Sequence, residues 1–187
     1  MANSIDVLAV VGSLRRESYT RRLVQAVAAL APPSLRIEIA SGVGELPLYN
    51  QDLDTAAPPA AWVAFRERIR RADGILFATP EYNRSMPGVL KNAIDVGSRP
   101  YGKSAWARKP TAVISASPGQ MGAFGANQHL RQCLVFLDMP ALQQPEAYIG
   151  GVDKLFDASG QISNPGTRQL CEKFLTAFAE WIKRQNG

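Results

Sequence analysis

Short apolar runs alternate with amphipathic helical patterns along the chain, and this alternation limits the possible folds more than any other feature. Runs at Ile5–Val11, Gly74–Thr79 and Thr111–Ser117 are short and rich in apolar or β-branched residues, as expected of strands buried on both faces. Leu35–Ile39 alternates apolar and polar residues, which predicts a more exposed strand. A weaker pattern predicts a fifth strand at Ala141–Gln143.

Apolar residues also recur at helical spacing between these runs and after the last of them. We expect each set to form the buried face of a helix. The sets are Leu23, Val27 and Leu30; Trp62, Phe65, Ile69 and Ala72; Leu90, Ala93 and Ile94; Leu130, Cys133, Leu134 and Leu137; and Leu170, Phe174, Phe178, Trp181 and Ile182. Strands that alternate with helices form a parallel sheet with helices on both faces. With right-handed crossovers, five strands favour the order 2-1-3-4-5, so the predicted fold class is an α/β three-layer sandwich.

The size and composition of the chain predict one globular domain over residues 1–187. This length can bury a sizeable core but is short for two ordinary domains. The hydrophobic content of 46% and the charged content of 20% are typical of soluble proteins. No apolar run approaches the ~20 residues that a membrane helix needs. The N-terminus lacks the basic segment of a secretory signal, so we expect a cytoplasmic location without membrane insertion.

Neither metal binding nor thiol chemistry is expected. Cys133 and Cys171 lie on the apolar faces of predicted helices, as reduced core residues do. The absence of a C-x-x-C pattern argues against a zinc ribbon or an iron–sulfur cluster. The single histidine, His129, follows no G-x-S-x-G motif, so serine–histidine catalysis is not indicated. We expect His129 on a helix surface or at an interface.

The formal net charge is +5, and arginines account for much of it. They cluster in two predicted helical regions, at Arg15, Arg16, Arg21 and Arg22 and at Arg66, Arg68, Arg70 and Arg71. Neither cluster has interleaved aromatic residues or a basic tail. The charge therefore favours small anionic ligands or solvated helix faces over nucleic acid.

The predicted strand order brings three loops to one crevice. In open α/β sheets, ligands bind beyond the carboxyl ends of the strands, where the strand order reverses. The loops that follow strands 1, 3 and 4 in this order are Ser13–Thr20, Pro80–Gly88 and Ser117–Gly125. All three are rich in Gly, Ser, Asn or Pro, so polar and turn-forming residues lie where a ligand is expected.

The first of these loops has the layout of a phosphate site. A buried strand ends at Gly12, and a loop with Ser13, Arg15 and Ser18 leads into a helix. The N–H groups and partial positive charge of a helix start attract anions, and hydroxyl and guanidinium groups add donors. A dinucleotide site would need G-x-G-x-x-G, so a mononucleotide is favoured. The alternative is a helix start capped by Ser18 or Thr20, with solvated arginines.

The second and third loops suit a flat ring. Prolines at both ends of the second loop restrict its backbone, Tyr82 offers an aromatic wall, and Asn83 offers a donor and an acceptor. The alternative is an ordinary turn in which Asn83 and Gly88 adopt unusual dihedral angles. The third loop has glycines spaced by three, and glycine permits close approach of the backbone to a ligand.

Together these motifs resemble the NAD(P)H-dependent FMN reductase family, above all its chromate- and quinone-reducing bacterial members. The motifs are Gly12-Ser13-Leu14-Arg15 with Ser18, Pro80-Glu81-Tyr82-Asn83, and Pro87-Gly88 with Leu90-Lys91-Asn92-Ala93 and Asp95. The resemblance covers nearly the whole chain. It implies a flavodoxin-like fold, noncovalently bound FMN, and a homodimer or homotetramer with the flavin near a subunit interface.

The resemblance also assigns roles by position. Ser13, Leu14, Arg15, Ser18, Tyr19 and Thr20 would hold the FMN phosphate. Pro80, Glu81, Tyr82, Asn83 and Arg84 would lie at the isoalloxazine ring, with Ser117 and Gly119 on its third side. Two positions depart from the family pattern. Many relatives have Asn in place of Thr20, and close relatives often have Tyr in place of Arg84.

The implied function is transfer of hydride from NAD(P)H through FMN to a quinone or a similar acceptor, such as chromate, an azo compound or free flavin. Turnover would be ping-pong, with no catalytic side chain and no metal, because the flavin carries the chemistry. Three alternatives remain. Free FMN could be the substrate, the protein could carry electrons without oxidising NAD(P)H, or it could bind nucleotides or nucleic acid. The positive charge disfavours the carrier.

Overall fold

The computed structural model describes residues 4–187, and its centre is a five-stranded parallel sheet. The strands are β1 (Ile5–Val11), β2 (Leu35–Ile39), β3 (Gly74–Thr79), β4 (Thr111–Ala116) and β5 (Ala147–Ile149). The α-helices are α1 (Tyr19–Ala29), α2 (Ala60–Arg71), α3 (Gly88–Gly97), α4 (Phe124–Phe136) and α5 (Pro165–Asn186). The strand order β2-β1-β3-β4-β5 and the flavodoxin-like α/β class confirm the predicted fold.

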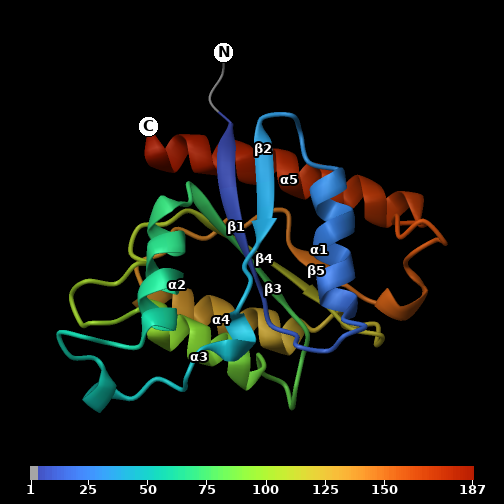
Figure 1. Cartoon of the computed structure of the whole chain (residues 1–187). Helices are drawn as coiled ribbons and strands as arrows, with labels where there is room; N and C mark the ends of the chain where they lie inside the picture. The colour runs from blue at the N-terminus through green and yellow to red at the C-terminus, as the bar shows by residue number, and fades with distance from the viewer. Residues whose placement is uncertain (1–3) are drawn as a thin grey trace.

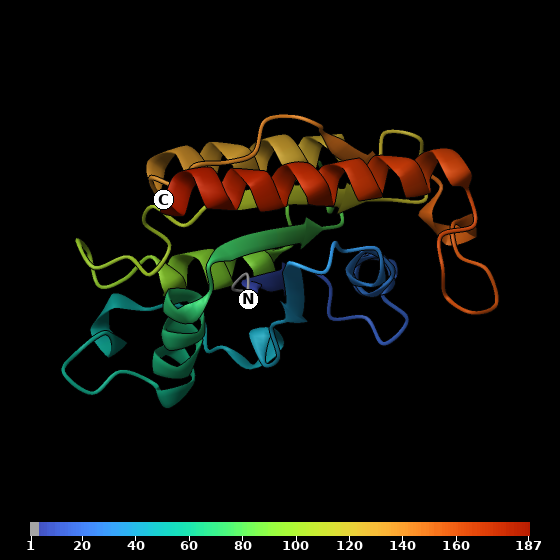
Figure 2. The ribbon, with the colours of Figure 1, turned by 90° about the horizontal axis from the view of Figure 1, so that it is seen from above.

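Helices cover both faces of the sheet and divide the core into two clusters. On one face, α1 and α5 pack on β1 and β4 through apolar residues such as Leu23 and Phe174. On the other face, α2, α3 and α4 pack through residues such as Trp62, Leu90 and Leu130. In Figure 1, α5 crosses the upper part of the view behind β1 and β2, and α3 and α4 lie in the lower part. Seen from above in Figure 2, α5 crosses most of the width of the molecule.

The predicted strand at Ala141–Gln143 is wrong. Ala141 forms only an isolated bridge with Thr111, and Leu142 donates one backbone bond to the same residue. Pro145 follows, and a proline has no N–H to donate to a sheet. Pairing with β4 therefore resumes only beyond it, at Ala147–Ile149. The other four strands lie where they are predicted, except that β4 ends at Ala116 instead of Ser117.

Candidate functional site

The first loop leaves the sheet at Gly12, which extends the pairing of β1 with β3 by one hydrogen bond from its N–H to the Ala78 carbonyl (2.8 Å). A Cβ at Gly12 would lie 3.1 Å from Leu90 Cδ2 and 3.4 Å from Pro80 Cδ. Glycine is therefore suited to this position because α3 and the second loop pack tightly against the end of β1.

Between Ser13 and Thr20 the backbone leaves its donors open. Within residues 4–187, none of the N–H groups from Ser13 to Thr20 donates a hydrogen bond to another protein group. Ser18 is the N-cap of α1, and its hydroxyl oxygen accepts from the Arg21 N–H (3.1 Å). The first turn of α1 has no acidic residue, and the Arg15 guanidinium lies 5.5 Å from the centre of the Tyr19 ring. Open N–H groups, a helix start and a neighbouring cation form an anion site.

The second loop is a two-residue hairpin rather than an open turn. Tyr82 and Ser85 exchange backbone hydrogen bonds of 2.9 and 3.0 Å. Asn83 and Arg84 at its tip both have positive φ, 52° and 64°, as a type I′ turn requires. The alternative of a turn with unusual dihedral angles at Asn83 and Gly88 is confirmed for Asn83 only, because Gly88 is the first residue of α3 and is not among the residues with positive φ. The hairpin holds the residues that precede it, Pro80 and Glu81, in a fixed direction over the end of the sheet.

Two side-chain contacts join the second loop to α4. Glu81 accepts a hydrogen bond from the Ala126 N–H (3.0 Å), and its other oxygen lies 3.2 Å from Arg84 Nη1. The hydroxyl of Ser85 lies 2.7 Å from His129 Nδ1. His129 is exposed on α4, as predicted, but its contact with the second loop had no marker in the sequence.

The glycines of the third loop contact protein backbone. Gly122 has a φ of +56°, and a Cβ there would lie 2.5 Å from the carbonyl carbon of Tyr148. The Ser115 hydroxyl, at the end of β4, donates to the Gly122 carbonyl (2.7 Å). Gly122 therefore packs the third loop against β5, whereas a Cβ at Gly125 would meet the second loop and one at Gly119 would meet only the Ser117 hydroxyl, at 3.7 Å.

The three loops form one cleft beyond the carboxyl ends of β1, β3 and β4. The predicted site residues that line it are Ser13, Arg15, Tyr19, Thr20, Pro80, Glu81, Tyr82 and Ser117. Three residues that the sequence did not single out also line it, namely Ala116, Pro118 and Val152. No motif in the sequence around Val152 indicates that it belongs to a site. The pairing of β4 with β5 brings it to the cleft, where its N–H donates to the Ser117 carbonyl (3.2 Å).

Five predicted residues lie outside the lining of this cleft. Leu14 is 60% exposed and packs over Gly44, Ser18 caps α1, and Gly119 accepts from the Ser117 hydroxyl (3.0 Å). Asn83 and Arg84 lie at the exposed tip of the hairpin. They border the cleft, so a ligand that extends past its mouth could reach them.

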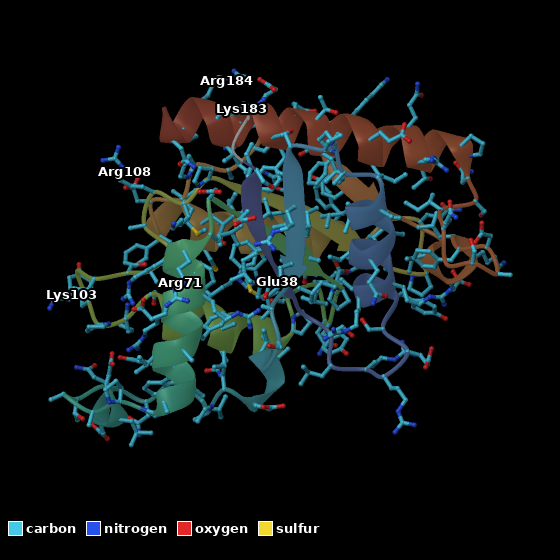
Figure 3. The ribbon with its side chains drawn as sticks, turned by 45° about the horizontal axis from the view of Figure 1, so that its top comes forward. Glu38, Arg71, Lys103, Arg108, Lys183 and Arg184 are labelled. Atoms are coloured by element: carbon cyan, nitrogen blue, oxygen red, sulfur yellow. The ribbon has the colours of Figure 1, made fainter. Side chains whose placement is uncertain are left out.

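A wider surface depression lies beside the amino-terminal half of β1 and the middle of β2, and Glu38 and Arg71 mark it in Figure 3. Most of its charges pair with one another. Arg36 pairs with Asp6 (2.8 Å) and Arg68 with Glu38 (2.7 Å). Paired surface charges do not indicate a ligand, whereas the cleft at the carboxyl ends holds open donors.

The third loop is supported by Tyr148 of β5. Its hydroxyl donates to Glu146 (2.6 Å) and accepts from the Gln128 amide (2.6 Å), and its ring packs on Phe124. Burial, together with the bond to Glu146, raises the pKa of Tyr148 to about 12. Glu146 therefore holds this tyrosine in place.

Comparison with known proteins gives a consistent result. The profile of the family described as NADPH-dependent FMN reductase matches residues 5–154. A quinone reductase of Pseudomonas putida is 59% identical over 183 residues, which are 98% of this chain and 97% of the relative. A 2-hydroxy-1,4-benzoquinone reductase of a Burkholderia species is 44% identical, over 96% of this chain and 97% of the relative.

Among solved structures, the flavoenzyme NAD(P)H:(acceptor) oxidoreductase FerB of Paracoccus denitrificans has a TM-score of 0.91 and 38% identity. The match covers 97% of this chain and 98% of FerB. Within residues 4–187, no helix is both long and apolar enough to span a membrane, and no group of three or more His, Cys, Asp and Glu could hold a metal ion.

The pKa of Tyr148 predicts a change of stability at alkaline pH. The folded protein keeps the Tyr148 proton above the ordinary pKa of 10.0, up to about 12. Its contribution to stability is therefore complete below pH 10 and is lost as the pH rises towards 12. Urea unfolding at about pH 9 and about pH 11 should show a smaller loss of stability in Tyr148→Phe than in the wild type. Tyr101→Phe, at a position 83% exposed, is the control and should match the wild type. Equal losses in the wild type and Tyr148→Phe would contradict the prediction.

Proposed function

The chain belongs to the NADPH-dependent FMN reductase family, and from this premise we propose that the cleft of its three loops is the FMN site of a quinone reductase. The protein is an NAD(P)H-dependent oxidoreductase that uses FMN and reduces quinones. The observation that carries the location of the site is the set of open N–H groups from Ser13 to Thr20 at the start of α1.

The chemistry of this donor set fits the phosphate of FMN. The phosphate would accept from the open backbone N–H groups, and the hydroxyls of Ser13 and Thr20 line the same cleft. Arg15 would supply a charged donor from the rim. Ser18 would act indirectly, because its side chain already caps α1.

The second and third loops fit the flat ring. Tyr82 is 51% exposed at the cleft, and Pro80 and Pro118 face it as well. Within residues 4–187, the side-chain amide of Asn83 has no hydrogen-bond partner, so it could meet the polar edge of a ring that extends past the cleft. When bound, FMN would supply the two-electron chemistry between NAD(P)H and the acceptor.

The residues of this chain would bind and orient. Glu81 is the carboxylate of the cleft, and both of its oxygens are engaged. We therefore assign no general acid or base. NAD(P)H and the quinone would use the same open side of the cleft in turn, which gives ping-pong kinetics. The electron-carrier alternative is not favoured, because the relatives are named as reductases.

The outward face of α4 supports the proposal of a homodimer or homotetramer. Gln132, Val135 and Phe136, near the end of α4, are exposed and uncharged. Val135 is 82% and Phe136 76% exposed, although both are apolar. An uncharged helix face with exposed apolar side chains fits a second copy of the chain.

The cytoplasmic location and the single domain over residues 1–187 stay predictions from the sequence.

The central test of the proposed function is a spectrum followed by a titration. The purified protein, after incubation with FMN and gel filtration, should show flavin absorbance. Anaerobic NADH or NADPH should bleach it, and a quinone should restore it. Steady-state double-reciprocal plots should give parallel lines. A protein that retains no FMN and binds none added would overturn the proposal. FMN lost on gel filtration but turned over in solution would indicate free FMN as the substrate.

The phosphate assignment predicts a difference between two ligands. Arg15→Gln removes a charged donor, so the Kd for FMN should rise roughly 10- to 100-fold. Riboflavin lacks the phosphate, so its Kd should stay unchanged. Quenching of flavin fluorescence measures both constants. Arg16→Gln is the matched control for net charge and should have a small effect on either ligand. If Arg15→Gln raises the Kd for FMN and the Kd for riboflavin by the same factor, the phosphate does not bind at Arg15.

The proposed oligomer predicts dissociation by a buried charge. Val135→Glu and Phe136→Glu would place carboxylates within an apolar interface, which is costly unless they are paired. Size-exclusion chromatography with light scattering should show the variants as monomers at concentrations where the wild type is a dimer or tetramer. Val63→Glu, at a 43% exposed valine of α2, is the control and should keep the wild-type state. A monomeric wild type would end this proposal.

A further inference from the structure

The start of α4 is capped by a residue that lies 45 positions away in the sequence. Ala126 is the third residue of α4, so its N–H has no acceptor within the helix. The N-cap residue, Ala123, has no side chain that could accept from it. Glu81 of the second loop takes this place and accepts from the Ala126 N–H at 3.0 Å. The carboxylate also meets the partial positive charge of the helix start.

Gly125 makes room for this carboxylate. A Cβ at Gly125 would lie 2.9 Å from Glu81 Oε2 and 3.1 Å from the Arg84 carbonyl oxygen. Side chains rarely tolerate such distances. A methyl group at residue 125 would therefore displace the Glu81 carboxylate from its place at the start of α4 and crowd the backbone of the hairpin.

One further contact joins the second loop to α4, between Ser85 and His129, and one ion pair lies within the loop itself, between Arg84 and Glu81. Arg84 Nη1 lies 3.2 Å from Glu81 Oε1, and the Ser85 hydroxyl lies 2.7 Å from His129 Nδ1. The Glu81 side chain is only 14% exposed, whereas that of Arg84 is 82% exposed. An exposed ion pair contributes little. The half-enclosed bond to Ala126 is consequently the main attachment of the loop.

We propose that Glu81 is a positioning residue, whose carboxylate joins the second loop to the start of α4 and so fixes the loop backbone that faces the flavin ring. This inference rests on the proposed function for the identity of the ligand. It also separates the two helix starts near the cleft. The start of α4 is occupied by Glu81, whereas the start of α1 stays open for a phosphate.

The proposal predicts how two different ligands respond. Glu81→Ala should raise the Kd for FMN and for riboflavin by the same factor, roughly tenfold, because the loop meets the ring and not the phosphate. Glu81→Gln keeps an oxygen that can accept from Ala126, so its effect should be smaller. Glu67→Ala is the matched control. Glu67 forms a comparable exposed pair with Arg70 on α2, and its loss should leave both constants unchanged.

The glycine gives an independent test. Gly125→Ala should raise the Kd for FMN and the Kd for riboflavin in the same way as Glu81→Ala does, because the added methyl group would displace the carboxylate. The loss in the double variant should be clearly smaller than the sum of the two single losses, since both changes break the contact of Glu81 and only the approach to the Arg84 carbonyl is separate. Fully additive losses would overturn the proposal.

Amide hydrogen exchange on the protein without flavin tests the contact whatever the ligand is. The Ala126 amide should exchange slowly in the wild type and at least tenfold faster in Glu81→Ala and Gly125→Ala. The inference is overturned if Ala126 exchange is unchanged in folded variants, or if only Tm falls and both flavin constants stay the same. If the wild type binds no flavin, the proposed function fails, and so does the assigned role of Glu81. The exchange data would then still report whether the contact exists. If Glu81→Ala does not fold, Glu81→Gln and Gly125→Ala carry the same comparison.

Discussion

The pairing of β1 with β3 is the constraint on which the site depends. These strands lie side by side, and β2 lies on the other side of β1. The connection from β1 to β2 and the connection from β3 to β4 therefore run to opposite sides of this pair. The pairing continues to Gly12, whose N–H bonds to Ala78. There the first loop and the second loop diverge, with Leu90 of α3 packed against the point of divergence. A phosphate site and a ring site can then share one cleft.

The two helix starts beside this cleft are chemically different. Both α1 and α4 lack acidic residues in their first turns, so local sequence would make either of them an anion site. The three-dimensional structure decides between them. Glu81 occupies the start of α4, whereas within residues 4–187 no carboxylate, that of Glu17 included, accepts a hydrogen bond from the N–H groups between Ser13 and Thr20. Of these two helix starts, the start of α1 is therefore the one that we propose for the flavin phosphate.

The sequence could predict what depends on periodicity and on local chemistry. Four strands and the strand order follow from such patterns, and of the two caps that the sequence left open, Ser18 and Thr20, the structure has Ser18. The fifth strand was placed wrongly, because three residues at an edge give little pattern and the missing N–H of Pro145 moves the pairing beyond it. The contact between Glu81 and Ala126 could not be predicted. It depends on how a hairpin with Asn83 and Arg84 in left-handed conformations directs the preceding residue.

The same contact changes how the charge of the chain is understood. A net charge of +5 suggests general attraction of anions, but most arginines near the sheet pair with carboxylates or with backbone. In the cleft itself, the negative charge of Glu81 is compensated by the start of α4 and by Arg84. Arg15 is left as the cation that lines the cleft without an ion pair to a described residue. An uncompensated positive charge attracts anions, so anionic ligands are drawn to the end of the cleft that holds Arg15. If the cleft holds FMN as we propose, its ring end would carry little net charge, which suits a site that accepts a nicotinamide and a quinone in turn.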